Sequence, residues 1–339
     1  MKSKILVTGG TGYIGSHTVV ELIESGYDVL IIDNLSNSQE FVIDRIEQIT
    51  GVRPQFFGFD LCDHAALNDC FRQVGKIDGV IHFAASKAVG ESVEKPLLYY
   101  RNNVLSLINL LDAMIENGIQ NIVFSSSCTV YGQPAELPVD EAAPILKAMS
   151  PYGNTKQICE EVLEDAANAN SSLKVTSLRY FNPVGAHDST LIGELPTGVP
   201  NNLVPFITQT AAGLRDSLKV FGNDYDTHDG TAVRDYIHVV DIAVAHVKTL
   251  QRMTAGKVEK PFNFFNLGKG VGYSVMDVIK AFESVSGLKL NYSIAPRRAG
   301  DVEKIYADAS LANKELDWEA ERSLEDMMRT AWEWQKSLN

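Results

Sequence analysis

A tyrosine and a lysine stand four residues apart in the stretch SPYGNTK, which runs from Ser150 to Lys156. Serine is a favoured helix N-cap and proline a favoured first helical residue, so the stretch predicts a helix that begins at Pro151. Residues at i and i+4 share one helix face, which brings the Tyr152 phenol near the Lys156 ammonium. Because a cation and the positive end of a helix favour phenolate, we expect Tyr152 to have a lowered pKa and to act as a base toward an alcohol.

A glycine-rich turn follows the first apolar run of the chain. In VTGGTGYIG the glycines are spaced as Gly9-x-x-Gly12-x-x-Gly15, which lets the backbone approach a pyrophosphate at the N-terminus of the next helix. Asp33 ends the next apolar run, and a carboxylate there accepts hydrogen bonds from ribose hydroxyls and repels a 2′-phosphate. The pattern predicts NAD rather than NADP. The alternative is that the glycines serve only helix–strand packing.

Further candidates follow later apolar runs. Ligands of open parallel sheets bind beyond the carboxyl ends of the strands, so the residues at these ends are expected to meet at one site. Ser127 is the candidate hydroxyl for a substrate oxygen or for Tyr152. Taken singly, Asp60 also suits a helix cap and Ser127 a loop start. The candidates are Asp60 with Leu61, Phe83 and Ala84 followed by Lys87, and Ser125 to Ser127.

The elements that must position these residues follow from the order of the apolar runs. From residue 4 to about 181, strand-length runs alternate with helical segments, which predicts an α/β fold with a Rossmann-type, doubly wound parallel sheet. After residue 182 the chain is rich in Gly, Pro and Asn, which predicts a smaller mixed α/β lobe made largely of loops. We expect a dinucleotide-binding domain at 1–181 and a substrate-binding domain at 182–339, and part of 236–262 is expected to return to the first. The strand-length runs are KILVTG, DVLIID, QFFGFD, GVIHFAA, NIVFSSS and LKVTSLRYF.

Composition and charge limit which binding partners and which cellular location are expected. The 339 residues carry a formal charge of −13, which argues against a nucleic-acid or anionic-membrane surface. Four scattered cysteines, without a C-x-x-C pair or ligand-spaced histidines, predict reduced thiols and no metal site. The apolar run after MKSK is too short for a signal-peptide core or a membrane span, so we expect a cytoplasmic location.

With these residues in hand, the chain resembles the extended short-chain dehydrogenase/reductase superfamily and, within it, the UDP-glucose 4-epimerase family. The resemblance implies NAD-dependent interconversion of UDP-glucose and UDP-galactose in galactose metabolism, through oxidation to a 4-keto sugar, rotation and re-reduction on the opposite face. It also implies a homodimer formed by helices near 97–117 and 151–169, although apolar stripes there also suit a buried core. The matching segments are VTGGTGYIGSHT, FAASKAVGESV, SSSCTVYG, SPYGNTK, LRYFNPVGAH, PNNL, VRDYIHV and APRRAGD.

The resemblance also implies roles for single residues. It makes Tyr152 the base, Lys156 its partner and Ser127 the hydroxyl that orients the substrate. Implied NAD contacts are Gly9, Gly12, Tyr13, Ile14, Gly15, Asp33, Asn34, Asp60, Leu61, Phe83, Ala84, Lys87, Asn102, Ser125, Tyr152, Lys156 and Tyr180. Implied UDP-sugar contacts are Ser127, Tyr152, Asn182, Asn202, Leu203, Phe221, Arg234, Arg298 and Asp301. Guanidinium groups of Arg234 and of the pair Arg297-Arg298 suit a diphosphate, and the alternative for each is a surface ion pair.

Three alternatives remain beside this prediction. Related nucleotide-sugar dehydratases and decarboxylases carry an acidic residue after the strand-end hydroxyl. This chain has Cys128 and Thr129 there, which counts against both of these activities. A non-catalytic NAD-binding scaffold is a further alternative, since a fold does not imply an activity. In the family, the residue four after the Asp of R-R-x-G-D influences room for an N-acetyl group. Here it is Ile305, of intermediate size, so we expect weak additional UDP-GlcNAc/UDP-GalNAc epimerisation at most.

Overall fold

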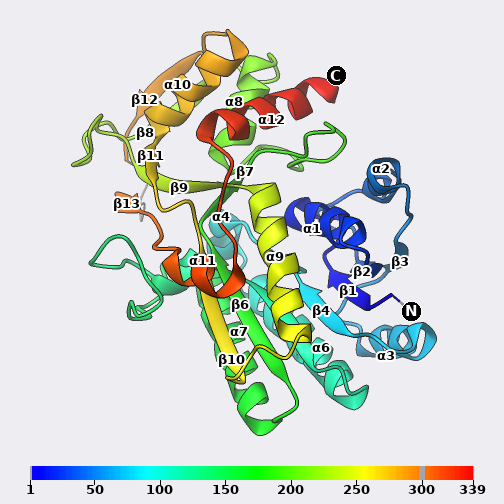
Figure 1. Ribbon diagram of the computed structural model, residues 1–339. Helices are drawn as coiled ribbons and strands as arrows, with labels where there is room; N and C mark the ends of the chain where they lie inside the picture. The colour runs from blue at the N-terminus through cyan, green and yellow to red at the C-terminus, as the bar shows by residue number, and fades with distance from the viewer. Residues whose placement is uncertain (1, 298–301, 339) are drawn as a thin grey trace.

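A seven-stranded parallel sheet is the central layer of the computed structural model, which describes residues 2–297 and 302–338 (Figure 1). Every neighbouring pair of strands in it is parallel. The prediction of a doubly wound α/β fold is confirmed. In order across the sheet the strands are β10 (Phe262–Leu267), β6 (Lys174–Tyr180), β5 (Asn121–Ser127), β4 (Gly79–His82), β1 (Lys4–Thr8), β2 (Asp28–Asp33) and β3 (Gln55–Gly58).

Alternate residues of the strands point into two hydrophobic layers. Ile5 and Val7 of β1 belong to the core on one face of the sheet, whereas Leu6 between them belongs to the core on the other face. All three are at most 1% exposed. Strands covered on both faces need apolar residues at every position, which is why they appear in the sequence as unbroken apolar runs.

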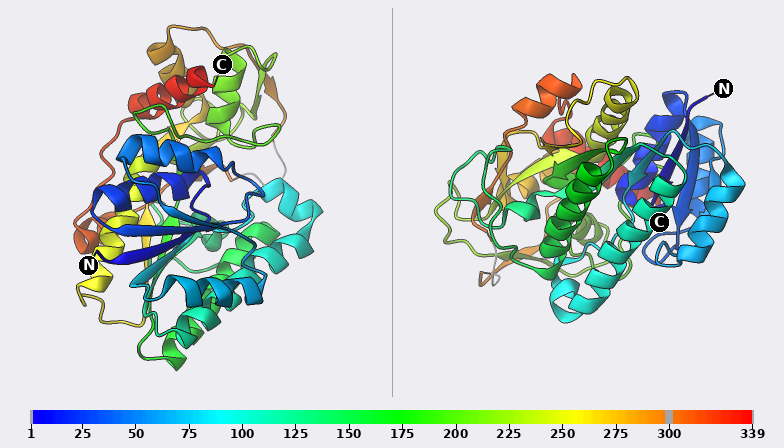
Figure 2. Two further views of the ribbon diagram at one scale, coloured as in Figure 1. Left: turned by 90° about the vertical axis from the view of Figure 1, so that its right-hand side faces the viewer. Right: turned by 90° about the horizontal axis from the view of Figure 1, so that it is seen from below.

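Helices cover both faces of the sheet (Figure 2). One layer contains α1 (Tyr13–Glu24), α2 (Phe41–Thr50) and α9 (Val239–Thr254), and α11 (Ser310–Leu316) packs beside α9 and β10. The opposite layer contains α3 (His64–Val74), α6 (Ser106–Glu116) and α7 (Pro151–Ala169). The prediction of a helix near 151–169 agrees with α7.

The other long helix expected near 97–117 is interrupted. Helix α4 (Val89–Glu94) is followed by α5 (Pro96–Tyr100), a π-helical turn η1 (Arg101–Leu105) and α6. Such π turns are often found at functional sites. This one carries Asn102 and Asn103.

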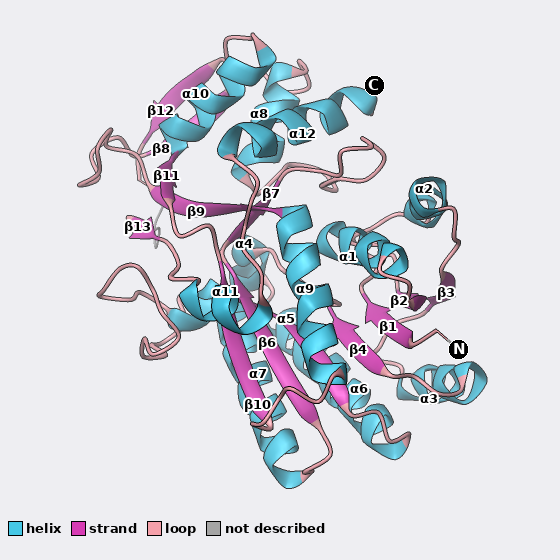
Figure 3. Cartoon of the chain, in the orientation of Figure 1, coloured by secondary structure: helices cyan, strands magenta, loops and turns pink. Residues whose placement is uncertain are grey.

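Residues from 182 onward build a second hydrophobic core beyond one end of the sheet (Figure 3). Helices α8 (Leu203–Ala211), α10 (Val275–Ser286) and α12 (Leu324–Ser337) pack together there. Strand β9 (Val233–His238) pairs with β7 (Asn182–Val184), β11 (Gly272–Ser274) and β13 (Lys304–Ile305), while β8 (Leu218–Phe221) pairs with β12 (Tyr292–Ala295). The prediction of a smaller mixed α/β lobe is confirmed, but its Gly/Pro/Asn-rich segments connect packed helices and paired strands, so the lobe is not made largely of loops.

Two elements from the later part of the chain pack with the seven-stranded sheet and its helices. Helix α9 packs on α1, and β10 is the edge strand beside β6. The strand lies at 262–267, just beyond the predicted returning range of 236–262. The division at residue 181 stays a prediction.

Within the described residues, no helix is both long and apolar enough to cross a membrane.

Candidate active site

The glycine turn brings β1, the start of α1 and the end of β4 into close contact. Gly9 has φ +71°, a conformation that favours glycine, and a Cβ added there would lie 2.7 Å from Ala84 N. A Cβ at Gly15 would lie 2.2 Å from Gly9 O. Gly12 is the N-cap of α1 and provides no side-chain cap. The turn therefore offers a close approach to helix N–H groups, as a pyrophosphate requires.

Asp33 is anchored behind this turn at the end of β2. The residue is 9% exposed, and its carboxylate accepts from Thr11 N at 3.2 Å and Leu35 N at 2.9 Å. Asn34 beside it donates to Asp60 Oδ2 at 3.0 Å. The ends of β2 and β3 are thus joined by polar side chains, in the arrangement expected for a ribose and adenine site.

The remaining expected NAD contacts line the same ends of the strands. Phe83 N donates to Thr8 O at 3.0 Å, and Asn102 Nδ2 donates to Ser86 Oγ at 3.1 Å in the segment after β4. Tyr13 OH donates to Gly185 O at 2.6 Å, so the start of α1 contacts the later part of the chain. Ile14 is partly buried, and Leu61 and Tyr180 are buried.

Helix α7 begins as the sequence predicts. Pro151 is its first residue, and the Ser150 hydroxyl caps it by accepting from Gly153 N at 3.2 Å. Lys156 is 3% exposed, and its ammonium donates to Ser125 O at 2.6 Å. The same ammonium lies 4.7 Å from the centroid of the Phe124 ring. The Lys156 side chain therefore reaches the carboxyl end of β5.

The Tyr152 phenol lies at the end of the same strand, within hydrogen-bonding reach of Ser127. Ser127 is 8% exposed, and its hydroxyl also accepts from Thr129 N at 3.3 Å in η2 (Cys128–Tyr131). The three candidate catalytic side chains, Tyr152, Lys156 and Ser127, are thus brought together by α7 and β5.

The expected direction of the Tyr152 pKa is wrong for the protein chain by itself. Burial raises the pKa of Tyr152 to about 12, and the hydrogen bond with Ser127 only partly opposes this. Burial also lowers the pKa of Lys156 to about 8, against the favourable fields of Cys159 and Glu160. Both groups lie at the end of β5, but burial, which disfavours both charges, determines the direction of the pKa shifts.

The expected UDP-sugar residues lie on elements of the second core that face this region. Asn182 begins β7, Leu203 begins α8, and Phe221 ends β8. Arg234 lies in β9, where its Nη1 donates to Val233 O at 2.8 Å. The predicted contacts Arg298 and Asp301 lie outside the described residues.

Arg297 and Asn202 have partners that the sequence did not indicate. Arg297 Nε pairs with Asp224 Oδ1 at 2.7 Å, and its guanidinium lies 4.0 Å from the Tyr225 ring, which agrees with the surface-pair alternative. Asn202 Nδ2 donates to Glu194 Oε1 at 2.6 Å, and Lys87 Nζ lies 3.3 Å from the same oxygen. Glu194 therefore joins an expected NAD contact to an expected substrate contact.

Comparisons with known sequences and solved structures show the family of this chain. The model of the GDP-mannose 4,6 dehydratase family matches residues 6–331. UDP-glucose 4-epimerase of Haemophilus influenzae is 52% identical over 98% of this chain and 97% of that protein. The crystal structure of UDP-glucose 4-epimerase from Stenotrophomonas maltophila, with bound NAD and formylated UDP-arabinopyranose, has a TM-score of 0.96 at 50% identity, covering 99% of this chain and 98% of that one. The chain belongs to the UDP-glucose 4-epimerase family.

A second solved structure of the UDP-glucose 4-epimerase family contains a bound nucleotide, UDP, in addition to the cofactor. The enzyme from Bifidobacterium longum, in complex with NAD+ and UDP, has a TM-score of 0.94 at 47% identity and covers 99% of this chain and 98% of that one. The matching family model bears the name of a dehydratase, but Cys128 and Thr129 occupy the positions where we expect an acidic residue in dehydratases. Burial raises the pKa of the Cys128 thiol to about 12, so it cannot replace that acid–base group near neutral pH.

Sequence reasoning within the family pattern missed Asn103. This side chain is 2% exposed, accepts from Ser86 N at 2.8 Å and donates to Ser86 O at 3.0 Å. It also donates to Thr155 Oγ1 at 3.0 Å, so it ties the segment after β4 to α7 next to Lys156. A lone asparagine beside Asn102 gives no sequence signal for such a role.

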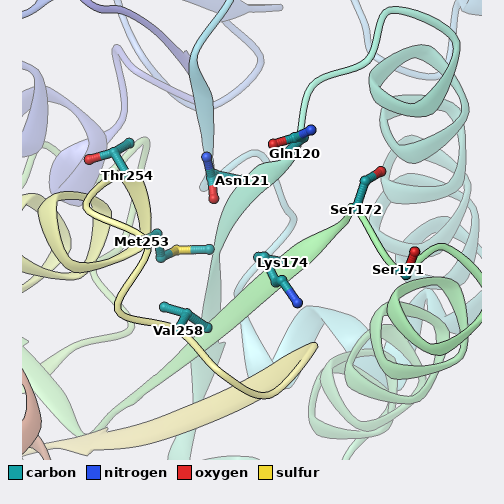
Figure 4. Close-up of a pocket in the computed structure, with 9 residues that line it drawn as sticks. Gln120, Asn121, Ser171, Ser172, Lys174, Met253, Thr254 and Val258 are labelled. Carbon is teal, nitrogen blue, oxygen red and sulfur yellow. The ribbon is translucent and has the colours of Figure 1, made fainter.

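One cavity lies away from these residues (Figure 4). Its volume is about 420 Å³, and Asn121 and Lys174, the first residues of β5 and β6, contribute to its lining. It is therefore at the amino ends of the strands. The candidate active site is at their carboxyl ends, where parallel sheets bind ligands.

Proposed function

We propose that this chain interconverts UDP-glucose and UDP-galactose as an NAD-dependent isomerase of galactose metabolism. The observation that carries the proposal is the meeting of Tyr152, Lys156 and Ser127 at the carboxyl end of β5, on the same edge of the sheet as the glycine turn. An alcohol oxygen beside Ser127 and Tyr152 would be within reach of a base and a hydrogen-bond donor.

The described residues fit NAD. A Cβ at Gly15 or Gly9 would fill the space in which the backbone of the turn approaches its neighbours, and Asp33 is held by Thr11 N just behind it. The turn would hold the pyrophosphate, Asp33 the adenosine ribose and Lys156 the nicotinamide ribose. The chemistry that NAD supplies when bound is acceptance and return of a hydride at C4, and its positive ring favours the Tyr152 phenolate.

Proton transfer is the task of the chain's own residues. Tyr152 takes the O4 proton as C4 is oxidised to the ketone and returns it after the sugar has rotated. Ser127 donates to the same oxygen and keeps it near the phenol. Because burial holds the pKa of Tyr152 at about 12 in the chain itself, the Lys156 cation and the bound cofactor must together favour its ionised form.

The UDP moiety has to stay fixed while the keto sugar turns. Arg234 is proposed to bind the diphosphate, together with Arg298, and a bidentate guanidinium suits both oxygens of a phosphate. Phe221 would stack on the uracil and Asp301 would bind its ribose. Asn182, Asn202 and Leu203 complete the proposed contacts.

Substrate breadth depends on the space beside Ile305. This side chain is 7% exposed and packs in a small hydrophobic cluster with Cys128 and Phe181, next to Ser127. We infer that UDP-glucose and UDP-galactose are the main pair, with weak activity on their N-acetylated analogues.

A homodimer is the proposed assembly. Exposed apolar side chains follow one another along α4, α5, η1 and α6, and Leu97 is 75% exposed. Several exposed apolar side chains along successive helices are typical of an interface, and a second copy of the same chain offers a matching surface. The members are Val89, Val93, Leu97, Leu98, Leu105, Ile108 and Ile115.

The proposed location is the cytoplasm. Its support is the state of the cysteines: Cys62, Cys70, Cys128 and Cys159 are all free, and three of the four are buried. Unpaired thiols are usual in a reducing compartment.

The test of the function uses the protein as purified, without added NAD. We expect it to convert UDP-galactose to UDP-glucose and to release NAD on acid denaturation. Tyr152→Phe should retain NAD and lose conversion by about 10² or more, as expected when a general base is removed. Tyr27→Phe, directly before the amino end of β2, is the matched control and should convert normally. Equal conversion by Tyr152→Phe would overturn the assignment of the base, and bound NAD without any conversion by wild type would favour the scaffold alternative.

A further inference from the structure

A buried ion pair lies one helical turn beyond Lys156 and is not used by the chemistry described so far. Arg179 Nε donates to Glu160 Oε1 at 3.0 Å, and Arg179 Nη2 donates to Glu160 Oε2 at 2.5 Å. The two side chains are 5% and 8% exposed. Such a bidentate pair has a defined geometry, and removing one partner would leave a buried charge uncompensated.

Glu160 also connects α7 to the strand that carries Ser127. The Ser126 hydroxyl donates to Glu160 Oε1 at 2.6 Å, and Lys156 donates to the neighbouring Ser125 O at 2.6 Å. Tyr152, Lys156 and Glu160 follow at intervals of four along α7, and each is linked to one of the last three residues of β5. Glu160 is thus the third link of α7 to the end of this strand.

Arg179 extends the same network to the turn that follows Ser127. Its Nη1 donates to Tyr131 OH at 3.0 Å, and its guanidinium lies 4.0 Å from the Phe264 ring. Tyr131 ends η2, and its hydroxyl donates to Asn266 Oδ1 at 2.7 Å on β10. A single buried guanidinium therefore contacts α7, which carries Tyr152 and Lys156, and the turn that follows Ser127.

We propose that Glu160, held by Arg179 and Ser126, is a positioning residue that fixes Tyr152 and Lys156 relative to Ser127. It acts through the helix and touches neither substrate nor cofactor. The inference rests on the proposed epimerase activity, for which the relative placement of the phenol, ammonium and hydroxyl decides the rate. Displacement of a catalytic group by about 1 Å can reduce a rate about 10²-fold.

Glu160 has an electrostatic consequence as well. Burial lowers the pKa of Lys156 to about 8, and the fields of Cys159 and Glu160 oppose that shift. Replacing the carboxylate by an amide removes an opposing negative charge and leaves Arg179 positive, so the Lys156 pKa should fall further. The titratable and charged groups that interact with Lys156 are Cys159 and Glu160 on α7, His82 on β4, and Arg179 on β6 through Glu160, while Tyr152 precedes Lys156 by four residues on α7.

The test compares Glu160→Gln with Glu164→Gln, an exposed glutamate one turn further along α7. In Glu160→Gln we expect kcat to fall about tenfold or more, with KM for UDP-galactose changed less than about threefold. The alkaline decline of the pH profile should begin about half a pH unit lower or more. Glu164→Gln should match wild type in all three, and Glu160→Asp should recover part of kcat.

A second readout is independent of turnover. NMR titration of isotope-labelled lysine side chains, with Lys156 assigned by its loss in Lys156→Arg, should show a lower pKa in Glu160→Gln than in wild type. If Glu160→Gln does not fold, Ser126→Ala, which removes one hydrogen bond but no charge, should lower kcat several-fold with unchanged NAD content. Lowered thermal stability with wild-type kcat and Lys156 titration would assign the pair to folding and overturn the inference. Failure of wild type to convert UDP-galactose would contradict the proposed function, while the titration would still decide the role of Glu160.

Discussion

Lys156 is a buried cation whose hydrogen-bond partner is a carbonyl oxygen rather than a carboxylate. Its contacts with Ser125 O and the Phe124 ring favour the ammonium, but burial still lowers the pKa of Lys156 to about 8. The charge is therefore close to its titration range at mildly alkaline pH. The i and i+4 spacing predicts that Tyr152 and Lys156 share a helix face. The direction of the Tyr152 pKa shift depends on the burial of the two side chains, and a seven-residue motif does not show burial.

Ile305 gives a prediction about substrate choice. Ile305→Ala should raise the efficiency on UDP-N-acetylgalactosamine relative to UDP-galactose, because it removes bulk from the cluster beside Ser127. Changing a hydrophobic pocket by one methylene group alters the ratio of kcat/KM for two substrates by about 10- to 200-fold. We therefore expect the ratio for UDP-N-acetylgalactosamine over UDP-galactose to rise about tenfold. The measurement is kcat/KM for both substrates.

A control and a stability measurement accompany this variant. Ile145→Ala, at a side chain that is 49% exposed, should leave the ratio unchanged. The free energy of unfolding of Ile305→Ala should fall by about 2–5 kcal/mol, as for other buried large-to-small changes. An unchanged ratio in a folded Ile305→Ala protein would mean that other residues set the breadth.

At the scale of elements, the first six strands could be predicted because each contains an apolar run of strand length. The start of α7 could also be predicted, since Ser150 and Pro151 are a cap and a first-turn residue. Helices were expected in the second lobe, but the positions of α10 and α12 were not predicted, although Ser274 and Ser323 each begin a capping box. Segments rich in Gly, Pro and Asn elsewhere in this part of the chain dominate its sequence pattern.

Connections between elements distant in sequence were the least predictable. Glu194 meets both Lys87 and Asn202, and Asn103 meets Ser86 and Thr155. Each is a single polar residue without a motif, and its partners are fixed only by the folded chain.

The glycine turn gives a prediction at this scale. Gly15→Ala should abolish most of the NAD retained on purification, because the new Cβ would lie 2.2 Å from Gly9 O and the turn would have to open. Gly90→Ala is the matched control, since a Cβ there meets nothing within 4 Å. The measurement is NAD released per protein chain, and full NAD content in Gly15→Ala would contradict the role of the turn.

The whole molecule is acidic, with a formal charge of −13, yet exposes an apolar surface along α4 to α6. Leu97→Asp should convert the proposed dimer to a monomer, because a charge buried in an apolar interface is left without a partner. Light scattering after size exclusion measures the mass directly. The control is Leu214→Asp, at a residue in the second lobe that is 59% exposed, and it should leave the mass unchanged. A monomeric wild type at micromolar concentration would refute the proposed assembly.

The central claim is that C4 loses and regains the same hydride while Tyr152 handles the O4 proton. The most direct test converts UDP-galactose carrying deuterium at C4, in ordinary water, with the protein as purified and no added NAD. The account predicts UDP-glucose that retains deuterium at C4, since a hydride held in the site does not exchange with solvent. Ordinary hydrogen from water at C4 of the product would contradict it and would point to proton exchange at that carbon.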